Sequence, residues 1–344
     1  MASIRDIAKM AGVSPASVSR ILNNDSSFSI NENTRKRVIE IANRVHYSKS
    51  KSKPGPKSAG EKMSIGLILR HTPQTELTDP YFRNIHQGID EEAAEWRLRT
   101  ETIFTMHDQD KDWDRIANYG AIIVEGEMTP DAIKRIRSLN KNVILVDVTP
   151  TTEELQCDYI CNDFLNKTNK ILDYLYSLGH RNIAYIGGRS SMVNMQGKTV
   201  YKKHDEREKT YLNWMKIHDL EQYSHTFISS WGTQEGLESS KKLLQLKERP
   251  TAVVVGSDPM ALGVYKGFSN HGVSIPDDIS VVSFDDVEIN RYLTPTLSSV
   301  YMDSAEMGKV AVRVAKDMIA EQNRMNMTII CHSKLNVRDS VAKK

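Results

Sequence analysis

Long apolar runs and cysteines are scarce in this chain of 344 residues. No stretch approaches the ~20 apolar residues that a membrane-spanning helix needs, so the sequence predicts no membrane helix. Its three cysteines are too few for a disulfide framework, and neither the Cys157/Cys161 pair nor Cys331-His332 has the spacing of a structural zinc site. The first ten residues, "MASIRDIAKM", hold no apolar signal core. We therefore expect a cytoplasmic protein without a metal site.

Motifs typical of enzymes are also missing. The chain has neither the Gly-x-Ser-x-Gly of a nucleophile elbow nor the His-Glu-x-x-His of a zinc protease. The glycine-rich "YIGGRSS" lacks the Lys-Ser or Lys-Thr of a phosphate-binding loop. Asp285 and Asp286 are adjacent, and neighbours on a strand point to opposite faces, which disfavours a pair acting together as acid and base. These absences predict a protein that is not an enzyme and needs no cofactor.

Charge is distributed unevenly along the chain. Residues 1–62 hold 12 Lys or Arg and 5 Asp or Glu, whereas the remainder holds 34 and 39. Such a basic segment on a mildly acidic body indicates a polyanionic partner for that segment, although a solvated basic tail is the alternative.

The length of the chain predicts two or three domains, at ~150 residues for each.

The first 22 residues predict two short helices joined by a tight turn. In "IRDIAKMAGVSPASVSRIL", Ser3 and Asp6 form a capping box, and apolar residues then recur at helical spacing. Gly12 suits the positive φ with which a chain leaves a helix. Ser14 can cap a second helix, and Pro15 fits its first turn.

A third helix follows, for which Ser29 and Glu32 form another capping box. Its predicted inner face carries Val38, Ile41, Ala42 and Val45. Three short helices bury little, and one use for them is to present a helix rigidly to the major groove of DNA. A small protein-interaction module is the alternative, but the spacing, the caps and the local charge together favour a helix-turn-helix headpiece over residues 1–47.

These residues resemble the headpiece of the lactose/galactose repressor family (LacI/GalR). The resemblance implies that Pro15, Ala16 and Arg20 read bases, with Arg20 donating to guanine. A phosphate contact is the alternative for Arg20. The DNA-binding residues that we predict are Ser14, Pro15, Ala16, Ser17, Ser19, Arg20 and Asn23.

Residues 48–62, which read "SKSKSKPGPKSAGEK", predict a basic and flexible linker. Family members usually carry a hinge helix here, with a Leu that wedges into the minor groove. This chain has no Leu between Leu22 and Leu67, and Pro54 and Pro56 disfavour a helix across them. We expect these lysines to contact the DNA without intercalation.

From Met63 onward, short apolar strands alternate with amphipathic helices, in two successive runs. This rhythm predicts an α/β fold with two doubly wound parallel-sheet lobes. We expect a first lobe over residues 63–160 plus about 292–323, and a second over 161–291 plus about 324–340.

Open parallel sheets bind ligands beyond the carboxyl ends of their strands. The candidate residues are therefore those that follow a strand, and an arginine, carboxylates and a tryptophan suit a polyhydroxylated ligand in a cleft between the lobes. They include Arg70, His71, Glu125, Asp147, Trp231, Asp258 and Asp285.

The resemblance extends over the body through "YFRNIHQGI", "LGHRNIAYIGG" and "IPDDISVVSFDD", a core similar to periplasmic sugar-binding proteins. It implies effector contacts by Arg207, Trp231, Asp258 and Asp285, and less clearly by Asp147. Other interpretations stay open: Trp231 can fill a gap between helix and sheet, Asp285 can cap a turn, and Arg207 can pair with Asp205 or Glu206. "CNDF" and "DEREKTY" look most like galactose-operon repressors of Gram-positive bacteria.

The sequence thus predicts a homodimeric repressor that binds a palindromic operator and is released by a small sugar, with galactose or a galactoside favoured. One alternative keeps the fold but uses a co-repressor ligand or a phosphoprotein partner. More remote alternatives are a sugar-binding transport protein and a sugar-acting α/β enzyme.

Overall fold

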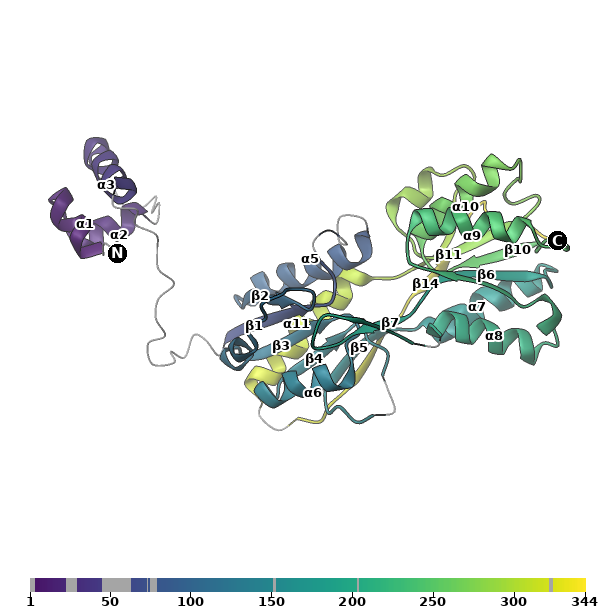
Figure 1. Ribbon diagram of the computed structural model, residues 1–344, viewed down its shortest axis with the longest axis horizontal. Coiled ribbons are helices and arrows are strands. Elements are labelled where there is room, and N and C mark those ends of the chain that lie inside the picture. The colour runs from purple at the N-terminus through teal and green to yellow at the C-terminus, as the bar shows by residue number, and fades with distance from the viewer. Residues whose placement is uncertain are drawn as a thin grey trace. The chain divides into compact units, whose positions relative to one another are not determined.

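The computed structural model divides the chain into two units, residues 1–58 and 59–344, which we describe separately (Figure 1). The structure describes residues 4–22, 30–44, 63–72, 74, 79–150, 153–202, 204–321 and 324–344. The predicted linker, 48–62, and the predicted capping residues Ser3 and Ser29 lie outside this part.

The described residues of the first unit form three helices around one small core. Val18 and Val38 are fully buried at its centre, as the helical spacing predicts. The third helix begins at Glu32, where Asn31 accepts a hydrogen bond from the amide of Asn33 at 2.9 Å. Asn31 therefore caps this helix within the described residues. The helices are α1 (Ile4–Ala11), α2 (Pro15–Leu22) and α3 (Glu32–Arg44).

The second unit consists of two α/β lobes, as predicted. The first lobe has a parallel sheet of order β13-β5-β4-β3-β1-β2. Helices α5 and α11 pack on one face of this sheet, and α6 and the 3-10 helix η2 pack on the other. The strands are β1 (Ser64–Leu69), β2 (Arg99–Thr105), β3 (Ala121–Glu125), β4 (Val143–Val146), β5 (Asp158–Asn162) and β13 (Thr328–Cys331). The helices are α5 (Pro80–Glu95), η2 (Trp113–Asn118), α6 (Pro130–Leu139) and α11 (Ser304–Ala320).

The second lobe repeats this plan with the order β14-β12-β11-β10-β6-β9, in which β14 runs antiparallel. Helices α7 and α8 pack on one face of the sheet, and α9 and α10 on the other. The strands are β6 (Ile183–Gly188), β9 (His225–Ser229), β10 (Ala252–Val255), β11 (Ser280–Asp285), β12 (Ser298–Tyr301) and β14 (Lys334–Asn336). The helices are α7 (Phe164–Ser177), α8 (Glu206–Ile217), η3 (Glu221–Tyr223), α9 (Thr233–Leu244), α10 (Asp258–Asn270) and η4 (Glu288–Tyr292).

A short hairpin, β7 (Ser191–Val193) and β8 (Thr199–Tyr201), adds a separate two-stranded sheet that the sequence pattern did not predict. Its strands have three residues each, and β8 is exposed throughout. Neither strand therefore carries the buried apolar run by which the longer strands were recognised.

Strand pairing moves two of the predicted lobe boundaries. β12 pairs with β11, so residues 298–301 belong to the second lobe and not the first. β13 pairs with β5, so residues 328–331 belong to the first lobe and not the second. The chain passes between lobes after Asn162, after Tyr301 and between Cys331 and Lys334.

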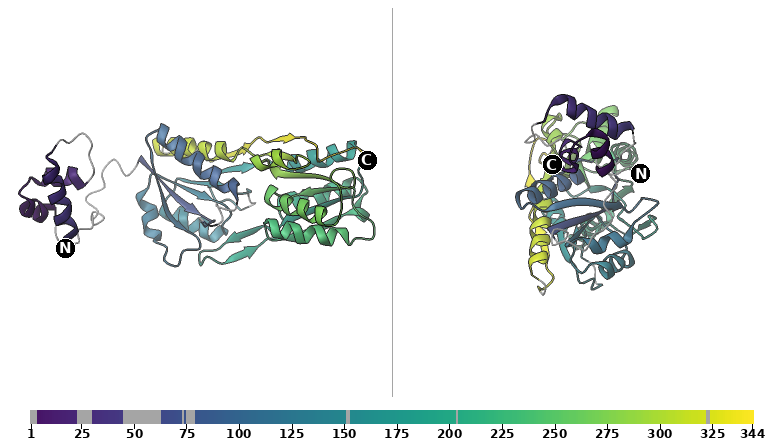
Figure 2. Two further views of the ribbon diagram at one scale, coloured as in Figure 1. Left: turned by 90° about the horizontal axis from the view of Figure 1, so that it is seen from above. Right: turned by 90° about the vertical axis from the view of Figure 1, so that its left-hand side faces the viewer.

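Glycines allow close helix contact within each lobe. A Cβ on Gly308 of α11 would lie 2.1 Å from the carbonyl oxygen of Ile85 on α5, and Figure 2 shows these helices side by side. In the second lobe a Cβ on Gly263 of α10 would lie 1.9 Å from the carbonyl oxygen of Thr233 on α9. Both pairs therefore pack backbone against backbone.

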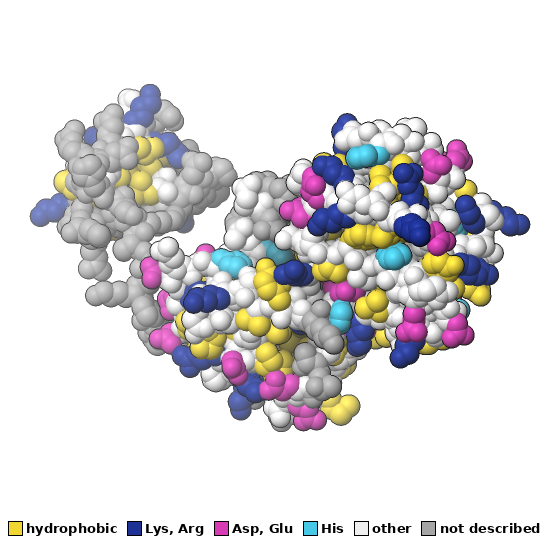
Figure 3. All heavy atoms as spheres, turned by 45° about the vertical axis from the view of Figure 1, so that its right-hand side comes forward, with side chains coloured by type: hydrophobic (Ala, Val, Ile, Leu, Met, Phe, Trp, Pro, Cys, Tyr) yellow, Lys and Arg dark blue, Asp and Glu magenta, His cyan; other side chains and the backbone are white. Residues whose placement is uncertain are grey.

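Positive and negative side chains are interspersed over the visible face of the second unit (Figure 3). None of the helices in the described ranges has the length and apolar character needed to span a membrane. The described residues also contain no group of three or more His, Cys, Asp or Glu placed to hold a metal ion.

Candidate DNA-binding and effector sites

The turn between α1 and α2 forms as the sequence predicts. Gly12 has a φ of 66°, and the amide of Val13 donates to the carbonyl of Ala8 at 3.1 Å. Ser14 then caps α2, because its Oγ accepts a hydrogen bond from the amide of Ser17 at 3.0 Å. The two helices are thereby fixed in a helix-turn-helix arrangement.

Helix α2 buries one face and presents the other. Val18 and Ile21 lie in the core of the unit. Pro15, Ala16 and Arg20 are exposed, as residues that read bases must be. The other predicted DNA-binding residues differ in exposure: Ser14 is exposed, Ser17 and Ser19 are half-buried, and Asn23 lies outside the described residues.

In the second unit, Asp147 accepts two hydrogen bonds at the end of β4. The Tyr81 hydroxyl donates to its Oδ1 at 2.9 Å, and the Asn162 amide donates to the same oxygen at 3.0 Å. Burial raises the pKa of Asp147 to about 6, against the opposing effect of these hydrogen bonds and of the Arg207 charge. Asp147 directly follows the last residue of β4, and its backbone has a φ of 57°.

Arg207, at the start of α8, is buried and forms a two-pronged ion pair. Its Nε and Nη2 donate to the two carboxylate oxygens of Asp205 at 2.7 and 3.1 Å, and its Nη1 donates to the carbonyl of Gly256 at 2.8 Å. Burial alone would lower the pKa of Arg207, but Asp205 raises it overall. Arg207 thus forms the ion pair with Asp205 that was the alternative to an effector contact. This pair lies inside the protein rather than on a solvated face.

Aromatic rings surround this guanidinium. Its central carbon lies 4.2 Å from the ring centre of Phe164, 4.5 Å from that of Trp231 and 5.7 Å from that of Phe284. The Trp231 indole donates to the carbonyl of Arg189 at 3.2 Å and keeps 38% of its surface exposed. Part of the indole is therefore open to a ligand.

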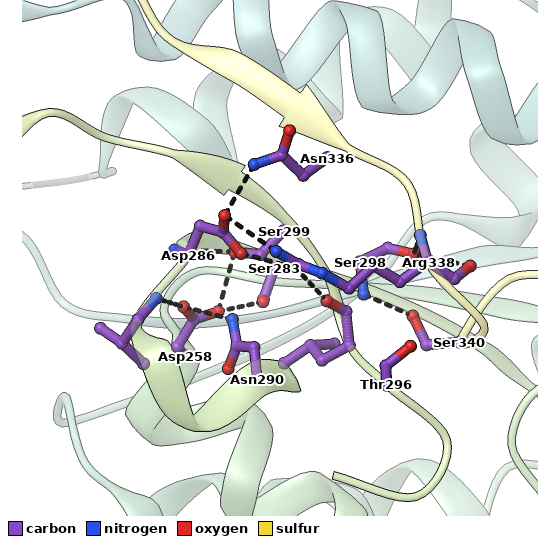
Figure 4. Close-up of polar contacts among 12 residues, drawn as sticks. Asp258, Ser283, Asp286, Asn290, Thr296, Ser298, Ser299, Asn336, Arg338 and Ser340 are labelled. Atoms are coloured by element: carbon purple, nitrogen blue, oxygen red, sulfur yellow. Dashed lines mark hydrogen bonds and ion pairs between the residues drawn. The ribbon is translucent and has the colours of Figure 1, made fainter. Parts of the chain in front are cut away.

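Asp258 is buried and its carboxylate is fully engaged within the protein (Figure 4). Oδ1 accepts from the hydroxyls of Ser283 and Ser299. Oδ2 accepts from the amide of Val287 at 2.8 Å and from Asn290 at 2.7 Å. Four donors satisfy its oxygens, so Asp258 holds the loop after β11 in place, and this geometry does not support the effector contact that we predicted for it.

Asp285 is the last residue of β11, directly before that loop, and has a φ of 103°. Its Oδ2 accepts from the backbone amide of Asp258 at 3.2 Å. Burial, followed by the charges of Asp258 and Asp79, raises the pKa of Asp285 well above its usual range, whereas Arg207 opposes the rise. Its neighbour Asp286 instead pairs with Arg338, so the two carboxyls have separate roles, as strand geometry predicts (Figure 4).

Asp79 caps α5 in the first lobe and interacts electrostatically with Arg207 and Asp285 of the second. We call Asp79, Asp147, Arg207 and Asp285 the interlobe group. Sequence reasoning missed Asp79, although an Asp before Pro80 at a helix start was a usable signal. It also missed Tyr81, Asn162, Phe164 and Phe284, whose partners come from distant segments.

The remaining predicted residues lie at the carboxyl ends of β1 and β3. Arg70 donates to Ser191 of the hairpin, and its charge interacts with that of Asp147. The His71 ring lies 3.7 Å from that of Phe82, tilted by 32°, and burial lowers the pKa of His71 to about 3. Glu125 is fully buried, 3.3 Å from the ring nitrogen of His86 on α5, so its carboxylate is enclosed beneath that helix.

Comparison with known proteins identifies the family. A model described as bacterial regulatory proteins, lacI family, matches residues 3–50, and one described as a periplasmic binding protein-like domain matches residues 172–341. The HTH-type transcriptional repressor MelR of Bacillus subtilis is 30% identical over 325 residues, 93% of this chain and 92% of MelR. The chain belongs to the lacI family of bacterial regulatory proteins.

Other lacI-family comparisons agree. The HTH-type transcriptional regulator GalR of Streptococcus thermophilus is 29% identical over 343 residues, 99% of each chain. The solved structure of the transcriptional regulator CelR with cellobiose has a TM-score of 0.68 at 19% identity and covers 99% of this chain and 100% of that one, which shows the fold. The likeness to galactose repressors of Gram-positive bacteria is thus confirmed, and this lacI-family chain is a DNA-binding transcriptional regulator and not an enzyme.

Proposed function

We propose that the chain represses a sugar-utilisation operon and that a small sugar, galactose or a galactoside, releases it from the operator. The observation that carries the proposal is the interlobe group with Trp231, in which half-buried carboxyls, a buried arginine and a partly exposed indole converge from both lobes. Carboxyl and guanidinium groups pair with neighbouring hydroxyls, and an indole covers the apolar face of a sugar ring.

The effector contacts that we propose are Asp147, Arg207, Trp231 and Asp285, with Asp79 added and with Arg70 at the edge of the group. Asp258 supports them indirectly, because its carboxylate holds the loop that follows Asp285 and its backbone amide donates to the Asp285 carboxyl. Glu125 has no direct part in this proposal, because it is enclosed against His86.

On the DNA side, we propose that the exposed face of α2 reads bases, with Arg20 donating to a guanine. Two copies of the chain would read the two halves of a palindrome, since a two-fold homodimer matches a two-fold operator. Acting on the chromosome, such a repressor would work in the cytoplasm.

The test begins by selecting a duplex sequence from a random pool with the full-length protein. A panel of sugars is then screened by thermal shift, because a ligand that binds only the folded state raises the melting temperature. Galactose or a galactoside should raise it and should weaken binding to the selected duplex by about 5–150-fold.

Asp285→Asn should abolish this response while DNA affinity in the absence of sugar stays unchanged. Asp131→Asn, at an exposed position of α6, is the matched control and should respond like the wild type. A sugar that strengthens DNA binding would favour the co-repressor alternative, and an unchanged response of Asp285→Asn would remove that residue from the effector site.

A further inference from the structure

The β7–β8 hairpin leaves the second lobe and lies against the first (Figures 1 and 2). Its backbone pairs with the segment after β3. The amide of Thr129 donates to the carbonyl of Val193 at 3.0 Å, and the amide of Val193 donates to the carbonyl of Glu127 at 3.1 Å. A strand of one lobe is therefore hydrogen-bonded into the backbone of the other.

Side chains strengthen this contact between lobes. Lys202, just after β8, forms an ion pair with Glu127 of the first lobe at 2.5 Å, and both side chains are largely buried. Arg70 of the first lobe donates to the hydroxyl of Ser191. Val193 is almost completely buried in the apolar core of the first lobe, and Met195 packs against that core.

The tip of the hairpin is shaped to fit the first lobe. Asn194 organises the turn, because its Oδ1 accepts from the amides of Gln196 and Lys198 at 3.1 and 2.9 Å. Gly197 has a φ of 78°, and a Cβ there would lie 2.6 Å from the carbonyl oxygen of Met106. Only glycine fits this approach to the backbone of the first lobe without displacement.

Both ends of the hairpin lead into the proposed effector site. Arg189, two residues before β7, accepts the hydrogen bond of the Trp231 indole. Asp205, four residues after β8, holds the Arg207 guanidinium. A shift of the hairpin would therefore move the partners of two ligand-contacting residues.

We propose that the β7–β8 hairpin is a clamp that fastens the second lobe to the first and positions the effector residues at both of its ends. The effector part of this inference rests on the proposed function, whereas the clamp itself does not. Lys202 and Ser191 are positioning residues, since they act through Glu127 and Arg70.

The test is hydrogen–deuterium exchange of full-length protein, read at the amides of Val193 and Thr129, with and without galactose. Lys202→Glu places two carboxylates together and should speed exchange at both amides about tenfold. Gly197→Ala should do the same without a change in charge. Lys202→Glu combined with Glu127→Lys restores opposite charges and should return exchange to near the wild-type rate.

The matched control is Lys134→Glu, which breaks an ion pair with Glu153 inside the first lobe and should leave both amides at wild-type rates. Wild-type exchange in Lys202→Glu and Gly197→Ala, or a double variant no slower than Lys202→Glu alone, would overturn the clamp. Galactose could protect neither amide in the wild type while the double variant still exchanges as slowly as the wild type. The clamp would then stand, and the proposed effector would fail.

Discussion

At the scale of single residues, the carboxyls near the lobe junction have distinct environments. Asp258 is enclosed by four donors, Asp147 by two, and Asp286 is held by Arg338. The rule that ligands bind beyond strand ends located Asp147 and Asp285 from the sequence alone. It could not separate a carboxyl that is open to a ligand from one already satisfied by the protein, because the donors to Asp258 come from three other segments.

The raised pKa of Asp147 predicts a pH dependence of stability. Its folded-state pKa of about 6 exceeds the ordinary 3.8, so folding favours the protonated form. Its contribution is therefore complete below about pH 4 and is lost as the pH rises through 6. Asp147→Asn keeps an acceptor for Tyr81 and Asn162 and tolerates the positive φ, but does not titrate.

Free energies of unfolding from urea titrations at pH 4 and pH 7 should reveal this difference. Relative to Asp147→Asn, the wild type should lose about 1–3 kcal/mol between these values. Parallel curves for the two proteins would show that Asp147 has an ordinary pKa. Asp163→Asn is a suitable control, because Asp163 caps the neighbouring helix α7 and an Asn can keep that cap.

At the scale of elements, apolar runs predicted most of the long strands and helices. β1 is buried at all six positions, and its run "SIGLIL" is unambiguous. The amphipathic segment around Trp113 forms a 3-10 helix, η2. The hairpin was missed because its stability comes from the first lobe, a contact between distant segments that local patterns do not contain.

At the scale of elements, we predict the effect of one substitution on the exposed face of helix α2. Arg20→Ala should relax the preference for one base pair in each half of the selected duplex, costing about 1–3 kcal/mol there, because a two-pronged contact to guanine would be lost. Competition binding with single-base variants of the duplex measures this loss. Lys36→Ala, at an exposed position of α3, should leave base preference unchanged. Equal weakening on all sequences would instead assign Arg20 to a phosphate.

At the scale of the whole molecule, the helical unit and the two-lobed unit have separate cores and opposite charge balance. This division was predictable, because composition and periodicity both change between residues 48 and 63. The points at which the chain passes between the lobes were not predictable. A strand such as β12 joins one sheet or the other according to its pairing partner, which its own sequence does not reveal.

The charge balance predicts how salt acts. Binding to DNA should fall steeply as salt rises, by about 10³-fold or more between 50 and 200 mM if six or more phosphates are contacted, since bound counterions are released. Sugar affinity, measured by titration calorimetry in the same buffers, should change little, because the interlobe group is largely shielded from solvent. Salt-independent DNA binding would contradict the role assigned to the basic segment.

The passages of the chain between the lobes also affect its synthesis. As the protein leaves the ribosome, the N-terminal helices α1, α2 and α3 emerge early and can fold, because the core residues described in them all lie between Ile7 and Ala42. The first lobe must wait for α11 and β13, and the second for β14, which are the last elements to be made. A message cut short before codon 304 would therefore yield folded N-terminal helices attached to a two-lobed unit that lacks α11, β13 and β14 and cannot complete its sheets.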